Sequence, residues 1–252
     1  MDKIQQKQQE QYKFEEFEQH VNLYNFIPAG DGKSIVLLRN IAEASQAGHF
    51  DKNPSILISG IGAEALALAF ANTVCSDDIR QCDARCFMGT KEMIYFYHES
   101  RFDSVHIISN IDKTSSDNIV WNFIKHKVYK FSLSFDGRLS EYVYLNGHLI
   151  LTATDIKKVS QPIIDALDFK VVVDPYTEEQ LEMIIKQRLK FCGIRYDAEV
   201  ITAMLEYFCG GLKGIIEVLR ICVLLASQEG KYKLTQEHVE KAVGMAFLPL
   251  ES

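Results

Sequence analysis

Short apolar segments alternate with polar ones over the first two thirds of the chain, a pattern typical of strands that alternate with helices. Apolar residues at helical spacing predict a helix at Ile35–Ala47, and Gly48 follows where a helix cap is expected. The Ala- and Leu-rich segment Gly62–Val74 predicts a second helix, buried on most sides. Lys91–Tyr97 is a possible third helix. The predicted core strands are Ser55–Ser59, Ile79–Cys86, Ser104–Ile108, Leu149–Thr152 and Val171–Val173.

Two regions depart from this alternation. Apolar residues on both sides of Asp136-Gly137, a strong two-residue turn signal, predict an inserted β-hairpin over about 127–147. From Thr177 onward the pattern is helical. Thr177 with Gln180 forms a capping-box pattern, Asp197 is a candidate cap for a helix ending at Gly210-Gly211, and Thr235 is one for a final helix. We expect a frayed arm at 1–12, an α/β core at 13–174 and a helical lid at 175–252.

Composition narrows the class of protein. The chain has 252 residues, 47% of them hydrophobic, and a net charge of -7. This length is sufficient for a sizeable core, whereas the charge disfavours avid binding of DNA or of an anionic membrane. Neither a membrane-spanning run nor a signal peptide is recognisable, so we expect a cytoplasmic location and no membrane partner. Six cysteines are too sparse for a disulfide scaffold.

An α/β core followed by helices suggests a nucleotide-binding ATPase, whose phosphate loop reads GxxxxGK[ST] between a strand and a helix. The turn after the strand Ser55–Ser59 reads Gly60-Ile61-Gly62-Ala63-Glu64. Gly60 and Gly62 are therefore candidates for contact with a nucleotide. The turn contains neither the lysine nor the hydroxyl of the motif.

At this turn the sequence resembles the AAA+ ATPase module of the RuvB type, the bacterial Holliday-junction branch-migration motor. The strand, turn and helix of that family align with Ile56–Asn72, and the resemblance extends from Lys13 to about Phe247. It is sharpest over Leu149–Leu181, which fits without a gap. The resemblance implies an AAA+ P-loop NTPase-like three-layer α/β core with a parallel sheet, followed by a small helical lid. Because the chain stops at Ser252, we expect the family's winged-helix domain to be missing.

The resemblance also implies that the catalytic positions are degenerate. The family's phosphate-binding lysine and Mg-coordinating threonine fall on Ala63 and Glu64, and its acidic pair falls on Ser109-Asn110. In one segment of the family, two arginines occur, and one of them reaches the neighbouring subunit. These two positions fall on Ile164 and Ala166. The lid arginine falls on Gly214, beside Lys213. Thr154 is the remaining sensor-like group, and Thr154 and Lys213 are candidates for contact with a nucleotide. Phosphoryl transfer requires the lysine, the metal and the acidic pair, so hydrolysis is not expected here.

One alternative phosphate loop exists. Gly30-Asp31-Gly32-Lys33-Ser34 contains a genuine GKS immediately before a predicted helix, although Ile27 stands where the first glycine belongs. The favoured interpretation is a polar turn in which Asp31 or Ser34 caps the helix. If the alternative holds, the chain binds ATP and Mg at Gly30, Gly32, Lys33 and Ser34.

Other chemistry-bearing groups are weaker. Cys75, Cys82 and Cys86 could bind a metal with Asp83, but their spacing is not that of a zinc ribbon, and core thiols are the favoured interpretation. The seven histidines include no HxxxH pair, and structural roles are expected for them. They are His20, His49, His98, His106, His126, His148 and His238. No GxSxG nucleophile motif occurs.

The predicted hairpin is the candidate partner surface. In RuvB-type proteins the corresponding hairpin docks a junction-binding protein, and here Tyr142 and Tyr144 would lie on its exposed face, or would instead pack on the fold. The leading hypothesis is a catalytically silent RuvB-like protein that acts as a non-hydrolysing subunit, adaptor or regulator in a DNA-processing assembly. Its partners would be AAA+ subunits or a junction-binding protein, with no cofactor and only weak nucleic-acid contact. The alternatives are an ATPase that uses Lys33 and, least favoured, a nucleic-acid-binding module.

Overall fold

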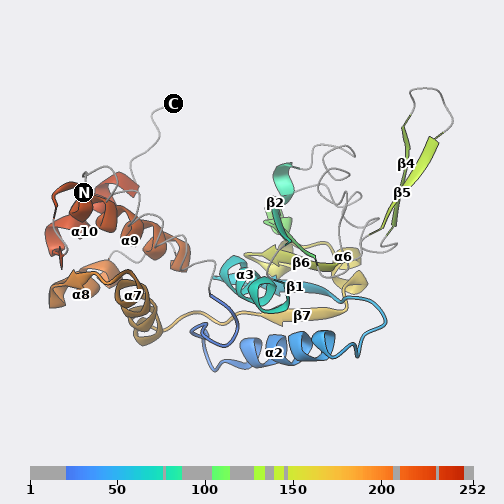
Figure 1. The fold of residues 1–252 in the computed structure, drawn as a ribbon, viewed down its shortest axis with the longest axis horizontal. Helices are drawn as coiled ribbons and strands as arrows, with labels where there is room; N and C mark the ends of the chain where they lie inside the picture. Colours follow the sequence, from blue (N-terminus) through green and yellow to red (C-terminus); the bar gives the residue numbers. More distant parts are fainter. Residues whose placement is uncertain are drawn as a thin grey trace. The chain divides into compact units, whose positions relative to one another are not determined.

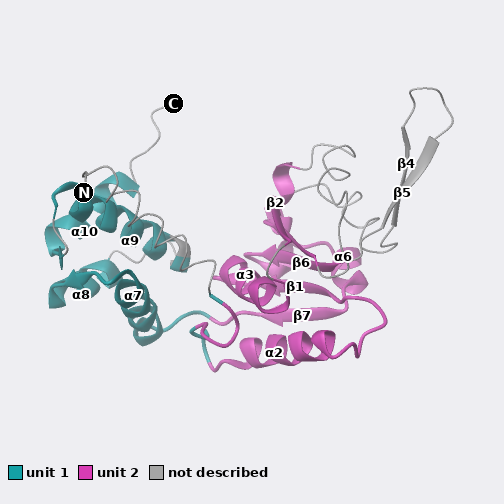
Figure 2. Cartoon of the chain, viewed as in Figure 1, with its two compact units in different colours: residues 1–21, 27–30, 175–252 teal, residues 22–26, 31–174 magenta. Residues whose placement is uncertain are grey.

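The structure is a computed structural model of the 252-residue chain. It describes residues 21–75, 78–86, 104–113, 128–133, 139–144, 147–206, 211–230 and 233–246. For 128–133, 139–144, 211 and 213 only the backbone is described. The described chain forms two compact units (Figure 2). One contains residues 22–26 and 31–174, and the other contains Val21, residues 27–30 and the residues after Asp174.

The first unit is built on a five-stranded sheet with the order β2-β3-β6-β1-β7, and all four neighbouring pairs are parallel (Figure 1). The strands are β1 (Ser55–Ser59), β2 (Ile79–Asp83), β3 (Val105–Ser109), β6 (His148–Ala153) and β7 (Phe169–Val172). The register pairs Ser59 with Ala153 and with Val172, and Asp83 with Ser109. The carboxyl ends of the strands therefore meet at one edge of the sheet, where open parallel sheets bind their ligands.

The central strands are buried along their whole length, as expected of a parallel sheet that is covered on both faces. Ile56, Leu57 and Ile58 are completely inaccessible to solvent, and each contributes about 1.5–3 kcal/mol by burial. Helix α3 (Ala63–Val74) packs against β1, β3 and β6, and α2 (Lys33–Gln46) packs against α3 and β7. A separate apolar cluster joins Leu57 and Leu151 to Ile163 of the short helix α6 (Gln161–Ala166).

The predicted α/β core with a parallel sheet is confirmed, and two of its details require correction. Helix α2 begins at Lys33, two residues before its predicted start, and Gly48 follows its end with φ 70°. Strand β2 ends at Asp83 and not at Cys86, because Ala84–Cys86 form the 3₁₀ turn η1. The Asp83 carboxylate accepts a hydrogen bond from the backbone N–H of Arg85, and such a bond competes with the strand ladder.

Two further 3₁₀ turns follow strands at the same edge of the sheet. They are η2 (Ile111–Lys113), after β3, and η3 (Ile156–Lys158), after β6. The predicted hairpin is present as β4 (Val128–Leu133) and β5 (Leu139–Tyr144), an antiparallel pair that forms its own two-stranded sheet. Its turn at Asp136-Gly137 and the predicted helix Lys91–Tyr97 lie outside the described residues.

The second unit is mainly helical. Its helices are α7 (Glu178–Cys192), α8 (Ala198–Glu206), α9 (Gly211–Gln228) and α10 (Gln236–Ala246). The Thr177 side chain accepts from the Gln180 N–H and the Gln180 side chain accepts from the Thr177 N–H, which confirms the predicted capping box. Gly211 begins a helix, where the sequence predicted the end of one. A parallel pair, β8 (Arg195–Tyr196) with β9 (Lys233–Leu234), was not predicted because two-residue strands have no detectable periodicity.

No helix in the described part of the chain is both long and apolar enough to cross a membrane.

Candidate functional site

The turn between β1 and α3 occupies the position of a phosphate loop, but it is short. Only Gly60, Ile61 and Gly62 separate the end of β1 from the start of α3. Counting back through the GxxxxGK[ST] spacing from Gly62 places the first glycine of the motif on Leu57. Leu57 is a buried β1 residue paired with Leu151 and Lys170. Residues 57–59 therefore belong to the strand, whereas the corresponding positions of a phosphate loop curve around the anion.

Gly60 is held tightly against the neighbouring strands. Its φ of 116° lies in a region that other residues rarely adopt, and a Cβ atom built there would lie 2.5 Å from the backbone oxygen of Val173. The Gly60 N–H donates to the oxygen of Ala153 at 2.9 Å, and the Ala63 N–H donates to Gly60 at 3.3 Å. Two backbone donors of the turn thus bond within the protein, and carbonyl oxygens lie against it.

The first two residues of α3 place a carboxylate and no cation beside the turn. Ala63 is buried and has no charge, and Glu64 adds a carboxylate to the first turn of the helix. A negative side chain at a helix N-terminus stabilises the helix dipole and competes with any second anion for that position.

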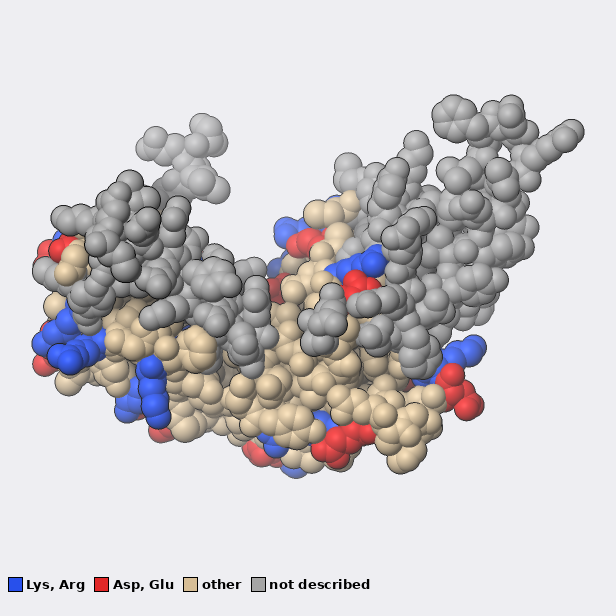
Figure 3. Space-filling view, in the orientation of Figure 1, with Lys and Arg blue, Asp and Glu red and all other residues tan. Residues whose placement is uncertain are grey.

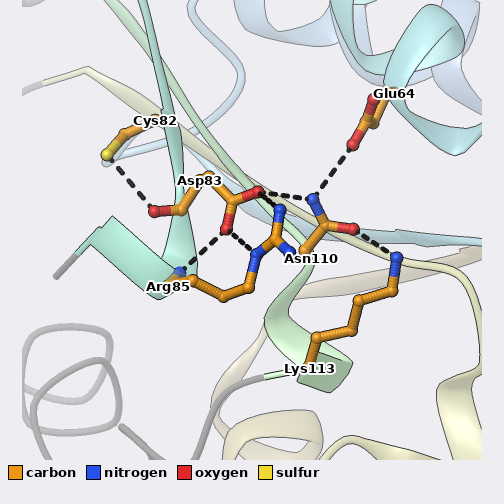
Figure 4. Close-up of polar contacts among 6 residues, drawn as sticks. All are labelled: Glu64, Cys82, Asp83, Arg85, Asn110 and Lys113. Atoms are coloured by element: carbon orange, nitrogen blue, oxygen red, sulfur yellow. Dashed lines mark hydrogen bonds and ion pairs between the residues drawn. The ribbon is translucent and has the colours of Figure 1, made fainter. Parts of the chain in front are cut away.

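A polar network occupies the carboxyl edge of the sheet beside this turn (Figure 4). Its central residue is Asn110, which follows β3 and adopts the left-handed conformation with φ 59°. The Asn110 amide donates to Asp83 at 2.8 Å and to Glu64 at 3.5 Å. Its carbonyl oxygen accepts from Lys113 Nζ at 2.9 Å. Asn110 therefore connects the ends of β2 and β3 to the start of α3.

Arg85 fixes the Asp83 carboxylate from the other side. The Arg85 guanidinium donates to the two Asp83 oxygens at 2.8 and 2.7 Å, a bidentate pair. These bonds to Arg85 hold the pKa of Asp83 well below its usual range, so Asp83 is charged at neutral pH. Within this network the two carboxylates of Glu64 and Asp83 balance the two cations of Arg85 and Lys113. Arg85 and Lys113 were not predicted from the sequence, although both lie near the carboxyl ends of predicted parallel strands, where such sheets bind ligands.

The positions aligned with the family's other catalytic residues are structural or exposed. Ser109 ends β3 and is half-buried, and Thr154 is exposed just after β6. Ile164 and Ala166 of α6 pack against the apolar cluster around Ile163. Gly214 lies in α9 with open space beside its Cα, and the Lys213 side chain is not among those described.

The alternative loop at Gly30–Ser34 lacks the strand that precedes a phosphate loop, since residues 21–32 contain none. The Gly30 N–H donates to Gln180 Oε1 at 3.2 Å, and Gln180 Nε2 donates to the Gly30 oxygen at 2.9 Å. Gly32 precedes α2 with φ 77°. The exposed Lys33 forms an ion pair with Asp31, which raises the pKa of Lys33 and lowers that of Asp31.

Of the two predicted caps of α2, only the Asp31 side chain accepts a backbone bond, from the Lys33 N–H at 3.0 Å. Ser34 lies inside the helix, so it does not cap it.

The cysteines and histidines provide no metal centre among the described residues. Cys75 is buried and Cys82 is half-buried, but Cys86 is exposed and is therefore not the core thiol that was expected. His106 and His148 are buried and contact serine hydroxyls, from Ser104 and Ser45 respectively.

The hairpin register separates two faces. Tyr142 is paired with Lys130 and Tyr144 with Val128, so these four residues share one face. The opposite face is more apolar than the face that holds Tyr142 and Tyr144, the two residues predicted to contact a partner. It holds Tyr129, Phe131, Leu133, Leu139, Glu141 and Val143.

Comparison with known proteins identifies the fold. No family model matches the chain, and no curated protein sequence matches it. Among solved structures, the Thermotoga maritima RuvB Holliday junction branch migration motor matches with a TM-score of 0.67 and 15% identity, over 91% of this chain and 73% of that one. A substituted form of the same protein matches with a TM-score of 0.68 and 14% identity, over 89% and 72%. The chain therefore has the AAA+ P-loop NTPase fold in the form found in RuvB.

Proposed function

We propose that this protein is a catalytically silent AAA+ protein that acts through protein contacts in a DNA-processing assembly. The observation that carries the proposal is the β1–α3 turn, which has three residues and leads into Ala63 and Glu64. The fold similarity to RuvB supports the connection with DNA. The role is that of a non-hydrolysing subunit, adaptor or regulator.

Electrostatics supports the absence of nucleotide chemistry at this turn. Two unit charges about 5 Å apart interact by about 3 kcal/mol at an effective dielectric constant of about 20, roughly a hundredfold in affinity. Glu64 thus adds a charge that repels phosphate, and Ala63 supplies no cation to offset it. The polar network around Asn110 links the Asp83 carboxylate to Arg85 and to the Asn110 amide, whose carbonyl oxygen accepts from Lys113. These residues do not fit a magnesium–nucleotide complex.

Calorimetric titration with ATP and Mg tests the proposal on the wild type and on Lys33→Ala in parallel. We expect no binding heat from either protein. Binding by the wild type that disappears in Lys33→Ala would refute silence and support the alternative ATPase at Gly30–Ser34. Binding that survives in Lys33→Ala would place a nucleotide elsewhere and would equally refute the proposal.

A restored-motif variant separates the effect of side chains from that of loop length. The double substitution Ala63→Lys, Glu64→Thr returns both missing groups but keeps the three-residue turn. We expect it still to bind no ATP, because β1 continues where the loop would curve. Micromolar binding by this variant would mean that the two side chains alone caused the silence.

The hairpin is the proposed contact with a protein partner, either an AAA+ subunit, including a second copy of this chain, or a junction-binding protein. Sedimentation of the wild type and of the double variant Tyr142→Ser, Tyr144→Ser tests self-association through that face. Phe131→Ser is the matched variant on the opposite face. Equal self-association by all three proteins would exclude the hairpin as the contact between copies.

Direct nucleic-acid binding is expected to be weak. The chain carries a net charge of -7. On the face drawn in Figure 3, basic side chains of the described residues are interspersed with acidic ones. Tight DNA binding with a steep salt dependence would contradict this part of the proposal.

A further inference from the structure

Two cysteines flank the ion pair that anchors the polar network. Cys82 is the next-to-last residue of β2, and Cys86 is the last residue of the turn η1. Asp83 and Arg85 lie between them, and their hydrogen bonds close the turn: the Arg85 N–H donates to Asp83 Oδ1 at 2.9 Å. Because this turn begins directly after Asp83, the two cysteines stand four residues apart on either side of a closed turn.

The environments of the two thiols differ. Cys86 is exposed, whereas Cys82 is half-buried and its Sγ points to the Asp83 carbonyl oxygen at 3.4 Å (Figure 4). Burial, followed by the proximity of Cys86 and Asp83, raises the pKa of the Cys82 thiol. An oxidant in solution therefore meets Cys86 first, and Cys82 is the thiol placed to react with the oxidised product. The other free cysteines of the described chain, Cys75, Cys192 and Cys222, are buried.

We propose that Cys82 and Cys86 are a modification site, at which a hydroperoxide converts the two thiols into an intramolecular disulfide. In the first step the Cys86 sulfur attacks the peroxide, the O–O bond breaks, and Cys86 becomes a sulfenic acid while the peroxide is reduced to an alcohol or water. In the second step the Cys82 sulfur attacks the Cys86 sulfur, the S–S bond forms, and the leaving hydroxide takes the Cys82 proton to give water.

The disulfide would enclose the Asp83–Arg85 pair in a closed ring. Asp83 holds Asn110, and Asn110 contacts Glu64 at the start of α3. Oxidation thus acts on the turn that supports the polar network, independently of whether the site binds a nucleotide.

Peptide mapping tests the proposal because trypsin cleaves between the two cysteines, after Arg85. The reduced protein is treated with a small excess of hydrogen peroxide, blocked with iodoacetamide under denaturing conditions and digested. We expect a linked pair of peptides, 81–85 with 86–91, two hydrogens lighter than the sum of the separate peptides. The thiol titre of the unfolded protein should fall by two from six.

Three variants make the test specific. Cys86→Ser, at an exposed position, should lose no thiols under the same treatment. Cys82→Ser should retain the sulfenic acid on Cys86, detected as a dimedone adduct. Cys75→Ser, a buried thiol outside the pair, should still yield the linked peptides. A wild type that gives Cys86 sulfinic acid, an intermolecular dimer or unmodified peptides, in place of the linked pair, would overturn the proposal.

Discussion

Acidification should destabilise this protein through His106, which lies in the interior strand β3. Its side chain is fully buried and shares a hydrogen bond of 3.1 Å with the Ser104 hydroxyl. Burial, with a smaller contribution from nearby Arg80, lowers the pKa of His106 from 6.5 to about 4, while Asp78 opposes the shift. Above pH 6.5 the ring is neutral in both states, so no stability is lost. As the pH falls from 6.5 towards 4 the unfolded chain binds a proton that the folded protein excludes, and stability decreases.

The loss of stability can be calculated from the difference between the pKa values of His106 in the unfolded and folded states. The pKa values of 6.5 in the unfolded chain and about 4 in the folded protein correspond to about 3 kcal/mol of stability in total, of which about 2 kcal/mol is lost between pH 7 and pH 5. Denaturant unfolding at these two pH values measures it, with His106→Gln as the variant that cannot titrate. His49→Gln, at an exposed histidine, is the matched control and should behave as the wild type. If His106→Gln loses as much stability on acidification as the wild type does, the reasoning is refuted.

Three further substitutions probe the turns that define the site and the helical unit. Gly60→Ala should lower the free energy of unfolding by about 3 kcal/mol or more, because the new Cβ would lie 2.5 Å from the Val173 oxygen. Gly48 also has a positive φ but has open space around it, so Gly48→Ala should lower the free energy of unfolding by only about 1 kcal/mol. Similar losses in denaturant titrations would show that the contact with Val173 is unimportant. Asn110→Ala should be about 1 kcal/mol less stable than Asn110→Gly, because both lose the amide but only glycine favours φ 59°; equal thermal midpoints would contradict this. His238→Ala should lower the free energy of unfolding by about 1–2 kcal/mol, because the Thr235 N–H donates to His238 Nδ1 at 3.1 Å. His238→Gln should recover part of that stability, because Gln at this position forms a capping box with Thr235. Calorimetric unfolding of the two variants would detect the difference.

Local signals predicted most of the secondary structure. Ser55–Ser59 is the strand β1 with the predicted bounds, because a fully buried parallel strand is a continuous apolar run bounded by a turn. The Thr177–Gln180 capping box needs only residues three apart, and the structure contains it. The end of β2 was misplaced because the Asp83–Arg85 turn depends on side-chain hydrogen bonds that apolar patterning does not contain.

The sequence by itself determined the order of strands and helices and the absence of a lysine after Gly62, since both are written in neighbouring residues. Only the tertiary structure decided that the β1–α3 turn has three residues, because the end of a strand depends on its partners Ala153 and Val172. The polar network was likewise decided in three dimensions. Asn110 reaches Asp83 across 27 positions and Glu64 across 46, and only the parallel alignment of β2 and β3 beside α3 brings these residues to one edge.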